Sequence, residues 1–230
     1  MIYNLDYIDE DINEYSDKIK KTSSKYLRSK ITNIITETII HEIRWKTTKK
    51  SYFSKEVLID YKPPRYGDKC SHRCVDIVQY IPPRRVLSDK DIENGKFICY
   101  EIKSCKYDVY SGNGLGFYGD ENWLVTTVST YNQIKSDILD GTFETFLRKY
   151  HPNSEARYGI KVIVPRHTNC NNIQNEFNKP TQLEYGKWKT HIVIPCPTGV
   201  RTKTTMELLF GILRSKECFE DMFYDSYKEG

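Results

Sequence analysis

The chain has 230 residues and a mass of 27.1 kDa, which favours a single domain, because α/β and all-β domains often reach about 200 to 250 residues. The 38% of hydrophobic residues is enough for a sizeable core, so the mean hydropathy of −0.64 indicates a polar surface rather than disorder. A net charge of +4 neither requires nor excludes an anionic partner.

No stretch approaches the roughly 18 apolar residues of a membrane span, and acidic residues occupy the place of a signal peptide's basic start. We therefore expect neither membrane insertion nor secretion. The seven cysteines are an odd number scattered over the chain, which is typical of reduced thiols and predicts a cytoplasmic location.

The N-terminal half predicts one helix followed by three strands. Residues 1–22 are expected to form an N-terminal arm or a short helix, and residues 23–230 a single domain. Apolar residues from Leu27 to Ile39 recur at helical intervals, which predicts a helix from Ser23 to about Ile43. Residues 52–61, 73–81 and 97–105 are predicted strands separated by turn residues, and we expect them to form an antiparallel meander.

The second half predicts a glycine-rich loop at 111–122, a strand at 122–128, and helix over 130–150 with a break at Gly141. Residues 158–165 and 191–197 are apolar runs typical of strands buried on both faces, with a surface excursion at 167–189 between them. Met206, Leu209, Phe210 and Leu213 mark a closing amphipathic helix. The order of elements predicts an α/β fold with a mixed β-sheet flanked by helices.

Asp76, Glu101 and Lys103 lie inside predicted strands, where an acid without a partner costs several kcal/mol, about 2 to 7 on transfer scales. Side chains alternate along a strand, so Glu101 and Lys103 project from one face, and Asp76 joins them if its strand is the neighbour. Two carboxylates beside an ammonium suit Mg²⁺ or Mn²⁺, with the lysine acting on a water near a phosphodiester. The pattern therefore indicates metal-assisted phosphodiester hydrolysis.

The order Asp76, then Glu101-Ile102-Lys103, resembles the motif of the PD-(D/E)XK nuclease superfamily. Within it, the segments HRCVDIV, CYEIKSCKYD and GDENWLVTTV look most like the MmcB-like group of DNA-repair-associated proteins. The resemblance covers roughly residues 30 to 215, although valine stands before Asp76 where the motif has proline. It implies a restriction-endonuclease-like core and a Mg²⁺-dependent deoxyribonuclease, active in repair or in conflict between a mobile element and its host. In that family the aspartate and glutamate hold the metal, and the lysine works on the attacking water.

Many nucleases of this class use one more glutamate, from the first helix or the first strand. Glu42 and Glu56 are both candidates, and the resemblance favours Glu56. It also assigns acidic positions to Asp108 and Asp120, for which the residues alone equally suggest turn capping.

The glycine-rich loop spells GxGxxG from Gly114 to Gly119, but a strand rather than a helix follows it, so it is not a dinucleotide loop. We expect either a bare flexible turn or a mobile segment beside the active site. Cys70, His72 and Cys74 have C-x-H-x-C spacing, which leaves a zinc-stapled interaction domain as one rival interpretation.

Basic residues suggest a DNA-binding face, for which Arg84, Lys106, Arg166 and Arg201 are the candidates. Nucleases of this kind often dimerise to cut two strands, which leaves a homodimer open. A second rival is a nuclease-like fold without turnover that binds DNA or protein as an inhibitor or adaptor.

Overall fold

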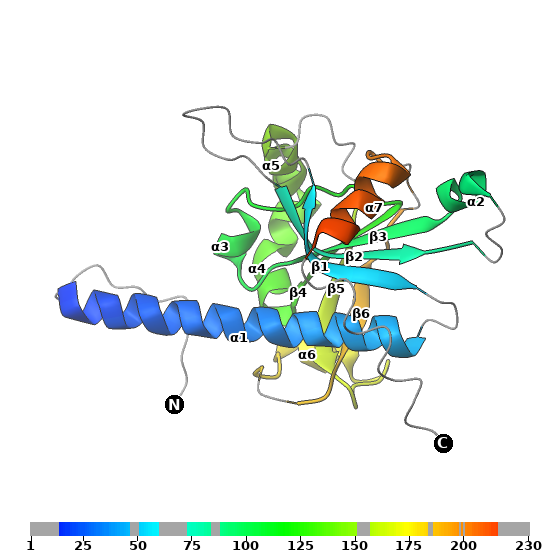
Figure 1. Ribbon diagram of the computed structural model, residues 1–230. Helices are drawn as coiled ribbons and strands as arrows, with labels where there is room; N and C mark the ends of the chain where they lie inside the picture. The colour runs from blue at the N-terminus through cyan, green and yellow to red at the C-terminus, as the bar shows by residue number, and fades with distance from the viewer. Residues whose placement is uncertain are drawn as a thin grey trace, which may run out of the picture.

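The computed structural model describes residues 14–46, 51–59, 73–83, 88–150, 157–183, 186–197, 199 and 201–215 (Figure 1). The strands are β1 (Tyr52–Ile59), β2 (Arg73–Ile81), β3 (Lys96–Ile102), β4 (Glu121–Thr127), β5 (Gly159–Pro165) and β6 (Trp188–Ile194). The helices are α1 (Glu14–Lys46), α2 (Asp89–Glu93), α3 (Lys106–Val109), α4 (Val128–Leu139), α5 (Thr142–Tyr150), α6 (Ile173–Asn178) and α7 (Thr205–Arg214). None of the helices described is both long and apolar enough to cross a bilayer.

The six strands form one mixed sheet in the order β1-β2-β3-β4-β5-β6. Strands β1, β2 and β3 pair antiparallel, which confirms the predicted meander. Strands β3, β4 and β5 pair parallel, and β6 returns antiparallel to β5. The carboxyl ends of β3, β4 and β5 therefore lie at the same edge of the sheet. The predicted α/β class with a mixed sheet flanked by helices is confirmed.

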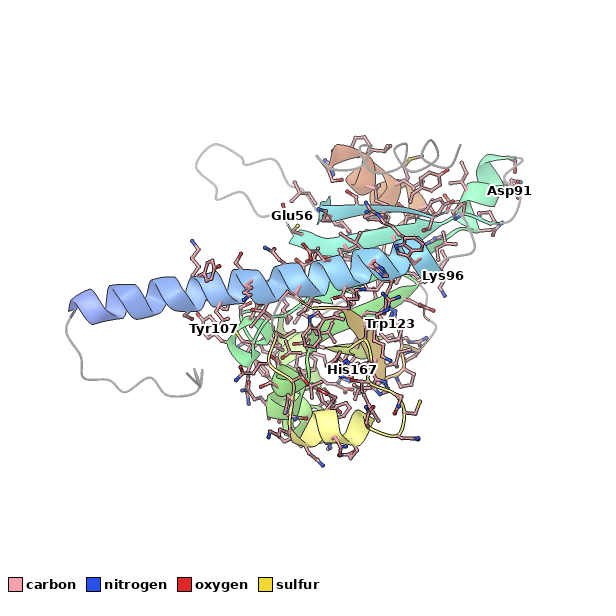
Figure 2. The ribbon with its side chains drawn as sticks, turned by 90° about the horizontal axis from the view of Figure 1, so that it is seen from below. Glu56, Asp91, Lys96, Tyr107, Trp123 and His167 are labelled. Carbon is pink, nitrogen blue, oxygen red and sulfur yellow. The ribbon has the colours of Figure 1, made fainter. Side chains whose placement is uncertain are left out.

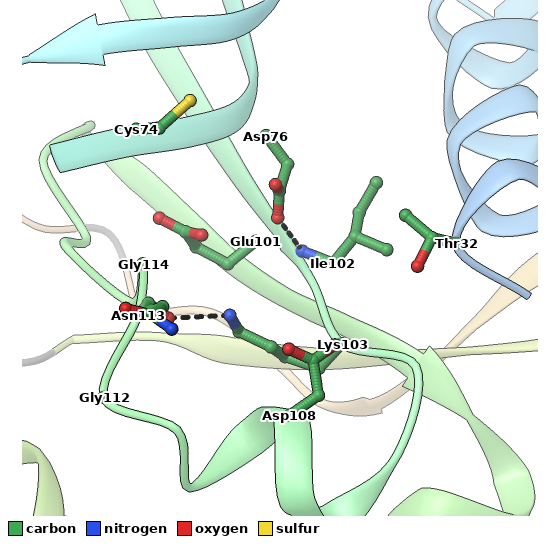
Figure 3. Close-up of a pocket in the computed structure, with 10 residues that line it drawn as sticks. All are labelled: Thr32, Cys74, Asp76, Glu101, Ile102, Lys103, Asp108, Gly112, Asn113 and Gly114. Atoms are coloured by element: carbon green, nitrogen blue, oxygen red, sulfur yellow. Dashed lines mark hydrogen bonds between the residues drawn. The ribbon is translucent and has the colours of Figure 1, made fainter. Parts of the chain in front are cut away.

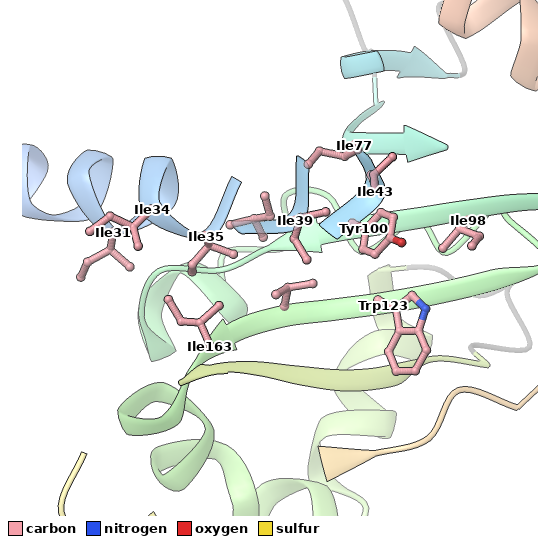
Figure 4. Packing of buried hydrophobic residues seen from close by; sticks show 12 residues of the cluster. Ile31, Ile34, Ile35, Ile39, Ile43, Ile77, Ile98, Tyr100, Trp123 and Ile163 are labelled. Atoms are coloured by element: carbon pink, nitrogen blue, oxygen red, sulfur yellow. The ribbon is translucent and has the colours of Figure 1, made fainter. Parts of the chain in front are cut away.

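Helices cover both faces of the sheet. The apolar side of α1 packs on β3 and β4, where Ile35 and Ile39 meet Tyr100 and Val125 in one buried cluster (Figure 4). On the other face, α4 and α5 cover β4 and β5, and α7 covers β1 to β3. Strand β5 contributes buried residues to both faces, as its apolar run predicts.

Helix α1 begins earlier than its apolar pattern indicates, at Glu14 rather than Ser23. Its first turns follow a sequence rich in charged residues, many of them good helix formers, and need no apolar stripe because this end extends past the sheet (Figure 1). Residues 14–22 of the predicted arm therefore belong to α1, and residues 1–13 lie outside the described part of the chain.

The prediction that residues 191–197 form a strand buried on both faces is wrong. Strand β6 starts at Trp188 and is an edge strand that pairs only with β5. Its side chains are only partly buried, and Ile192 is 51% exposed. Because β6 lies at the edge of the sheet, its apolar side chains are covered by the rest of the protein only in part. The surface excursion at 167–189 contains the short helix α6 and ends where β6 begins.

The prediction of which side of α7 faces the core is also largely wrong. Met206, Phe210 and Leu213 are more than half exposed, whereas Leu208 and Ile212 are buried against β1. Gly211 lies on the side of α7 that faces the sheet, where a Cβ would lie 3.0 Å from Val57 Cγ1. Glycine at this position lets α7 approach the sheet along the face of Leu208 and Ile212.

We expect Leu208→Ala to lower the free energy of unfolding by about 2 to 5 kcal/mol, because Leu208 is fully buried. Leu213→Ala, on the same helix but 58% exposed, is the matched control and should change it by less than about 0.5 kcal/mol. Urea unfolding of the two variants measures both values. Equal losses would contradict the orientation of α7.

Candidate functional site

The register of β2 and β3 brings Asp76 and Glu101 together. Their pairing runs from Ile81↔Lys96 to Ile77↔Tyr100 and ends there. Continuing the same register by one residue places Asp76 opposite Glu101. Beyond this point the Asp76 carboxylate accepts the Ile102 N–H at 2.6 Å, in place of a backbone carbonyl. The two strands therefore separate at the acids, and the freed backbone donor is satisfied by one of them.

A pocket of about 480 Å³ opens where the strands separate (Figure 3). Its lining comes from α1, β2, β3, α3 and the glycine-rich loop. The lining residues are Thr32, Cys74, Asp76, Glu101, Ile102, Lys103, Asp108, Gly112, Asn113 and Gly114. The three residues that the sequence singled out, Asp76, Glu101 and Lys103, are thus brought to one cavity.

The carboxylate of Glu101 is almost completely removed from water, since only 1% of the residue's surface is exposed. Its Oε1 accepts the Gly116 N–H at a long 3.4 Å, and its Oε2 is buried without a hydrogen-bond partner among the described residues. Burial, and next the charge of Asp76, raise the pKa of Glu101 to about 8. A carboxylate in this state either keeps a proton or requires a cation.

Asp76 shares this difficulty. Burial raises its pKa, while the Ile102 N–H and the Lys103 ammonium act in the opposite direction. The negative charges of Asp108 and Glu56 raise the pKa of Asp76 further. The acids around the pocket therefore oppose one another's ionisation, which is typical of a site that attracts positive charge.

Lys103 supplies a positive charge to the pocket, where its ammonium contacts the glycine-rich loop. Its side chain is 5% exposed, and Nζ donates to the Asn113 carbonyl at 2.7 Å. The Lys103 backbone N–H donates to Val125, which extends the pairing of β3 with β4. The backbone of Lys103 is thus fixed by the sheet, and its side chain reaches the loop.

Of the two candidates for an extra acid, Glu56 lies beside the site and Glu42 does not. The pairs Lys55↔Ile77 and Val57↔Val75 place Glu56 opposite Asp76, at an exposed position with a φ of +50° (Figure 2). Glu42 accepts the Thr190 N–H at 2.8 Å and its hydroxyl at 2.7 Å, so it joins α1 to β6. Glu56, Asp76 and Glu101 therefore form a row across three strands, although Glu56 does not line the pocket.

The glycine-rich loop is neither a bare turn nor a dinucleotide loop. Leu115, Phe117 and Tyr118 are buried and anchor it, while Gly112 to Gly114 line the pocket. Gly114 has a φ of +68°, and a Cβ there would lie 2.5 Å from Glu101 Oε2. The loop thus closes over the buried carboxylate at a distance that only glycine allows.

The acids on either side of this loop have different roles. Asp108 lines the pocket and accepts the Ser104 N–H at 2.9 Å and the Ser104 hydroxyl at 3.1 Å, which fixes the turn after Lys103. Asp120 lies at the other end of β3, where it accepts the Phe97 N–H at 2.8 Å.

The candidate DNA-binding residues are divided between the two ends of the sheet. Lys106 begins α3 beside the pocket and pairs with Asp137 at 3.1 Å, and Arg166 is exposed directly after β5, at the same edge. Arg201 lies at the start of β3 instead, where it contacts Glu93, Asp120 and the Gly95 carbonyl. Arg84 lies outside the described residues.

Sequence reasoning missed Thr32, Asn113 and the pocket position of Cys74. Thr32 carries no signal, since it is a polar residue on a helix surface, and Asn113 acts through its backbone carbonyl. Burial raises the pKa of the Cys74 thiol to about 12, so it is protonated.

The zinc interpretation depends on Cys70 and His72, which lie outside the described residues. The five cysteines described are free, and no group of three or more histidine, cysteine, aspartate or glutamate side chains in this part of the chain is arranged to hold a metal.

Comparisons with protein-family models, with curated proteins and with solved structures found no match to the chain. The function is therefore inferred from the site itself.

Because the pKa of Glu101 is raised from 4.5 to about 8, the folded state becomes less stable as the pH rises through this window. We expect Glu101→Gln to match the original protein at roughly pH 5 and to exceed its stability at roughly pH 9 by on the order of 1 to 3 kcal/mol. Urea unfolding in EDTA measures the difference. The same substitution at the exposed Glu144, Glu144→Gln, serves as the control. If the difference in unfolding free energy between Glu101→Gln and the original protein does not change with pH, the raised pKa of Glu101 is refuted.

Gly114→Ala and Gly141→Ala form a second matched pair, because both glycines have positive φ. A Cβ at Gly141 meets nothing within 4 Å, whereas one at Gly114 meets Glu101. We expect both variants to lose about 1 kcal/mol from backbone strain, and Gly114→Ala to lose at least about 1 kcal/mol more. Thermal unfolding of both variants checks this, and an equal loss would show that the loop does not press on Glu101.

Proposed function

We propose that this chain is a divalent-metal-dependent nuclease of the PD-(D/E)XK type that hydrolyses phosphodiester bonds of DNA. The observation that carries the proposal is the convergence of Asp76, Glu101 and Lys103 on one pocket at the separated ends of β2 and β3. The order helix, antiparallel meander and parallel strand supports a restriction-endonuclease-like core. In this chain the crossover from β3 to β4 contains only the four-residue helix α3.

The carboxylates fit a Mg²⁺ or Mn²⁺ ion. Among the described residues Glu101 Oε2 is buried without a donor, and burial raises the pKa of both acids, more than the Lys103 ammonium offsets. Mg²⁺ is commonly held by one or two carboxylates together with waters and substrate phosphate oxygens. Asp76 and Glu101 are therefore a sufficient protein contribution, although no larger ligand group occurs among the described residues.

The charge of the pocket explains why a cation has to precede the substrate. Asp76, Glu101 and Asp108 line the cavity, and Lys103 is the one basic residue among the described residues that line it. A phosphodiester is repelled by this arrangement until the excess of negative charge is neutralised. Once bound, a divalent ion supplies Lewis-acid stabilisation of the phosphoryl oxygens and lowers the pKa of bound water.

The residues of the chain have separate tasks in this scheme. Asp76 and Glu101 would hold the ion, and Asp76 also accepts the Ile102 N–H where the strands separate. The Lys103 ammonium would orient the attacking water. To do so, it would give up its hydrogen bond to the Asn113 carbonyl and donate to the water instead. Glu56, opposite Asp76 in the row of acids, is the candidate for the additional acid.

DNA as the substrate, the cytoplasmic location and the homodimer remain predictions. The rival function, a binding module without turnover, uses the same pocket, so only a cleavage measurement separates the two.

We expect Asp76→Asn, Glu101→Gln and Lys103→Ala each to lower Mg²⁺-dependent cleavage of labelled DNA by on the order of 100-fold or more, because each removes a metal ligand or the group on the attacking water. Lys103→Ala should keep most of the DNA affinity. Glu144→Gln, on α5 and not part of the pocket lining, is the control and should cleave normally.

EDTA should abolish cleavage and added Mg²⁺ or Mn²⁺ should restore it. Cleavage that persists in EDTA, or that survives Asp76→Asn at the original rate, would contradict the metal mechanism. Binding of DNA without any cleavage under all metal conditions would support the rival binding module.

A further inference from the structure

The two outer walls of the pocket are α1 and α3. Thr32 lines it from α1, and Asp108 lines it from α3 (Figure 3). A polymeric substrate that reaches the carboxylates has to continue outward past these helices. The side chains beside Thr32 and Asp108 therefore indicate what kind of polymer the pocket accepts.

The α1 wall continues as a basic stripe. Lys25, Arg28 and Thr32 are spaced i, i+3 and i+7, so they lie on one side of the helix and lead away from the pocket over about 10 Å. Lys25 is exposed and Arg28 is partly exposed. No acidic residue occurs between residues 24 and 36. This segment leads to the end of α1 that extends past the sheet (Figures 1 and 2).

The α3 wall carries an aromatic ring. Tyr107, directly before the pocket residue Asp108 on α3, is 77% exposed. An exposed tyrosine contributes little to the core, whereas an exposed ring next to a residue that lines the pocket offers a surface on which a base can stack. Stacking on a side chain requires a base that is not already stacked in a duplex.

We propose that the pocket receives single-stranded nucleic acid, with phosphates along Lys25 and Arg28 of α1 and an unpaired base stacked on Tyr107 of α3. This inference rests on the proposed nuclease function and specifies its substrate. The basic stripe supplies the attraction that the acidic pocket lacks, because it draws the backbone to the mouth while the carboxylates hold their cation inside.

Fluorescence anisotropy with a short labelled oligonucleotide in Ca²⁺, which we expect to occupy the carboxylates without supporting cleavage, tests binding separately from cleavage. We expect the single strand to bind about 10-fold tighter than its blunt duplex, and Lys25→Ala/Arg28→Ala to weaken binding about 10-fold. The same double variant should reduce the slope of log affinity against log salt by about 1.4, or 0.7 for each phosphate contact. Lys90→Ala/Arg148→Ala, which removes exposed cations from α2 and α5, is the charge-matched control and should bind normally.

Tyr107→Ala should weaken single-strand binding about 10-fold, whereas Tyr107→Phe, which keeps the ring, should bind normally. Equal or tighter binding of the duplex, or unchanged binding by Tyr107→Ala and Lys25→Ala/Arg28→Ala, would overturn this inference while leaving the Mg²⁺-dependent cleavage assay untouched. Binding that follows the stripe and Tyr107 without any cleavage would support this surface and reject the nuclease.

Discussion

The site depends on the hydrogen bond between the Asp76 carboxylate and the Ile102 N–H, made where the pairing of β2 with β3 ends. A regular antiparallel ladder would satisfy this donor with a backbone carbonyl and would leave no room between the strands. Because a side chain takes the donor, β2 and β3 separate and the pocket opens beside Glu101. One acid therefore both shapes the cavity and supplies part of its charge.

Some features of the pocket lower the stability of the fold. Glu101 is buried with one oxygen unpartnered, Gly114 closes over it with positive φ, and the Lys103 ammonium contacts the Asn113 carbonyl. The first two features cost free energy in the metal-free chain, and a divalent cation between the carboxylates would relieve the first of them. Such local costs are typical of functional sites, and they distinguish this pocket from a surface ion pair of the Glu-Lys type.

Much of the fold and the centre of the site could be predicted, because alternation along strands is a local property. It places Glu101 and Lys103 on one face, and turn residues between the strands predict the meander that brings Asp76 to them. Properties set by distant partners could not be predicted in this way. The buried face of α7 depends on Gly211 meeting Val57, and the exposure of β6 depends on its place at the edge. The contact of Glu42 with Thr190 and the pairing of Arg201 with Glu93 and Asp120 likewise carry no sequence signal.

The central claim is that Asp76 and Glu101 share one divalent cation. A crystal soaked in Mn²⁺ tests it most directly, because manganese is located by its anomalous scattering. The account predicts one strong anomalous peak within coordination distance, about 2.0 to 2.3 Å, of oxygens from both carboxylates. A pocket without such a peak, at a Mn²⁺ concentration that supports cleavage in solution, would contradict it.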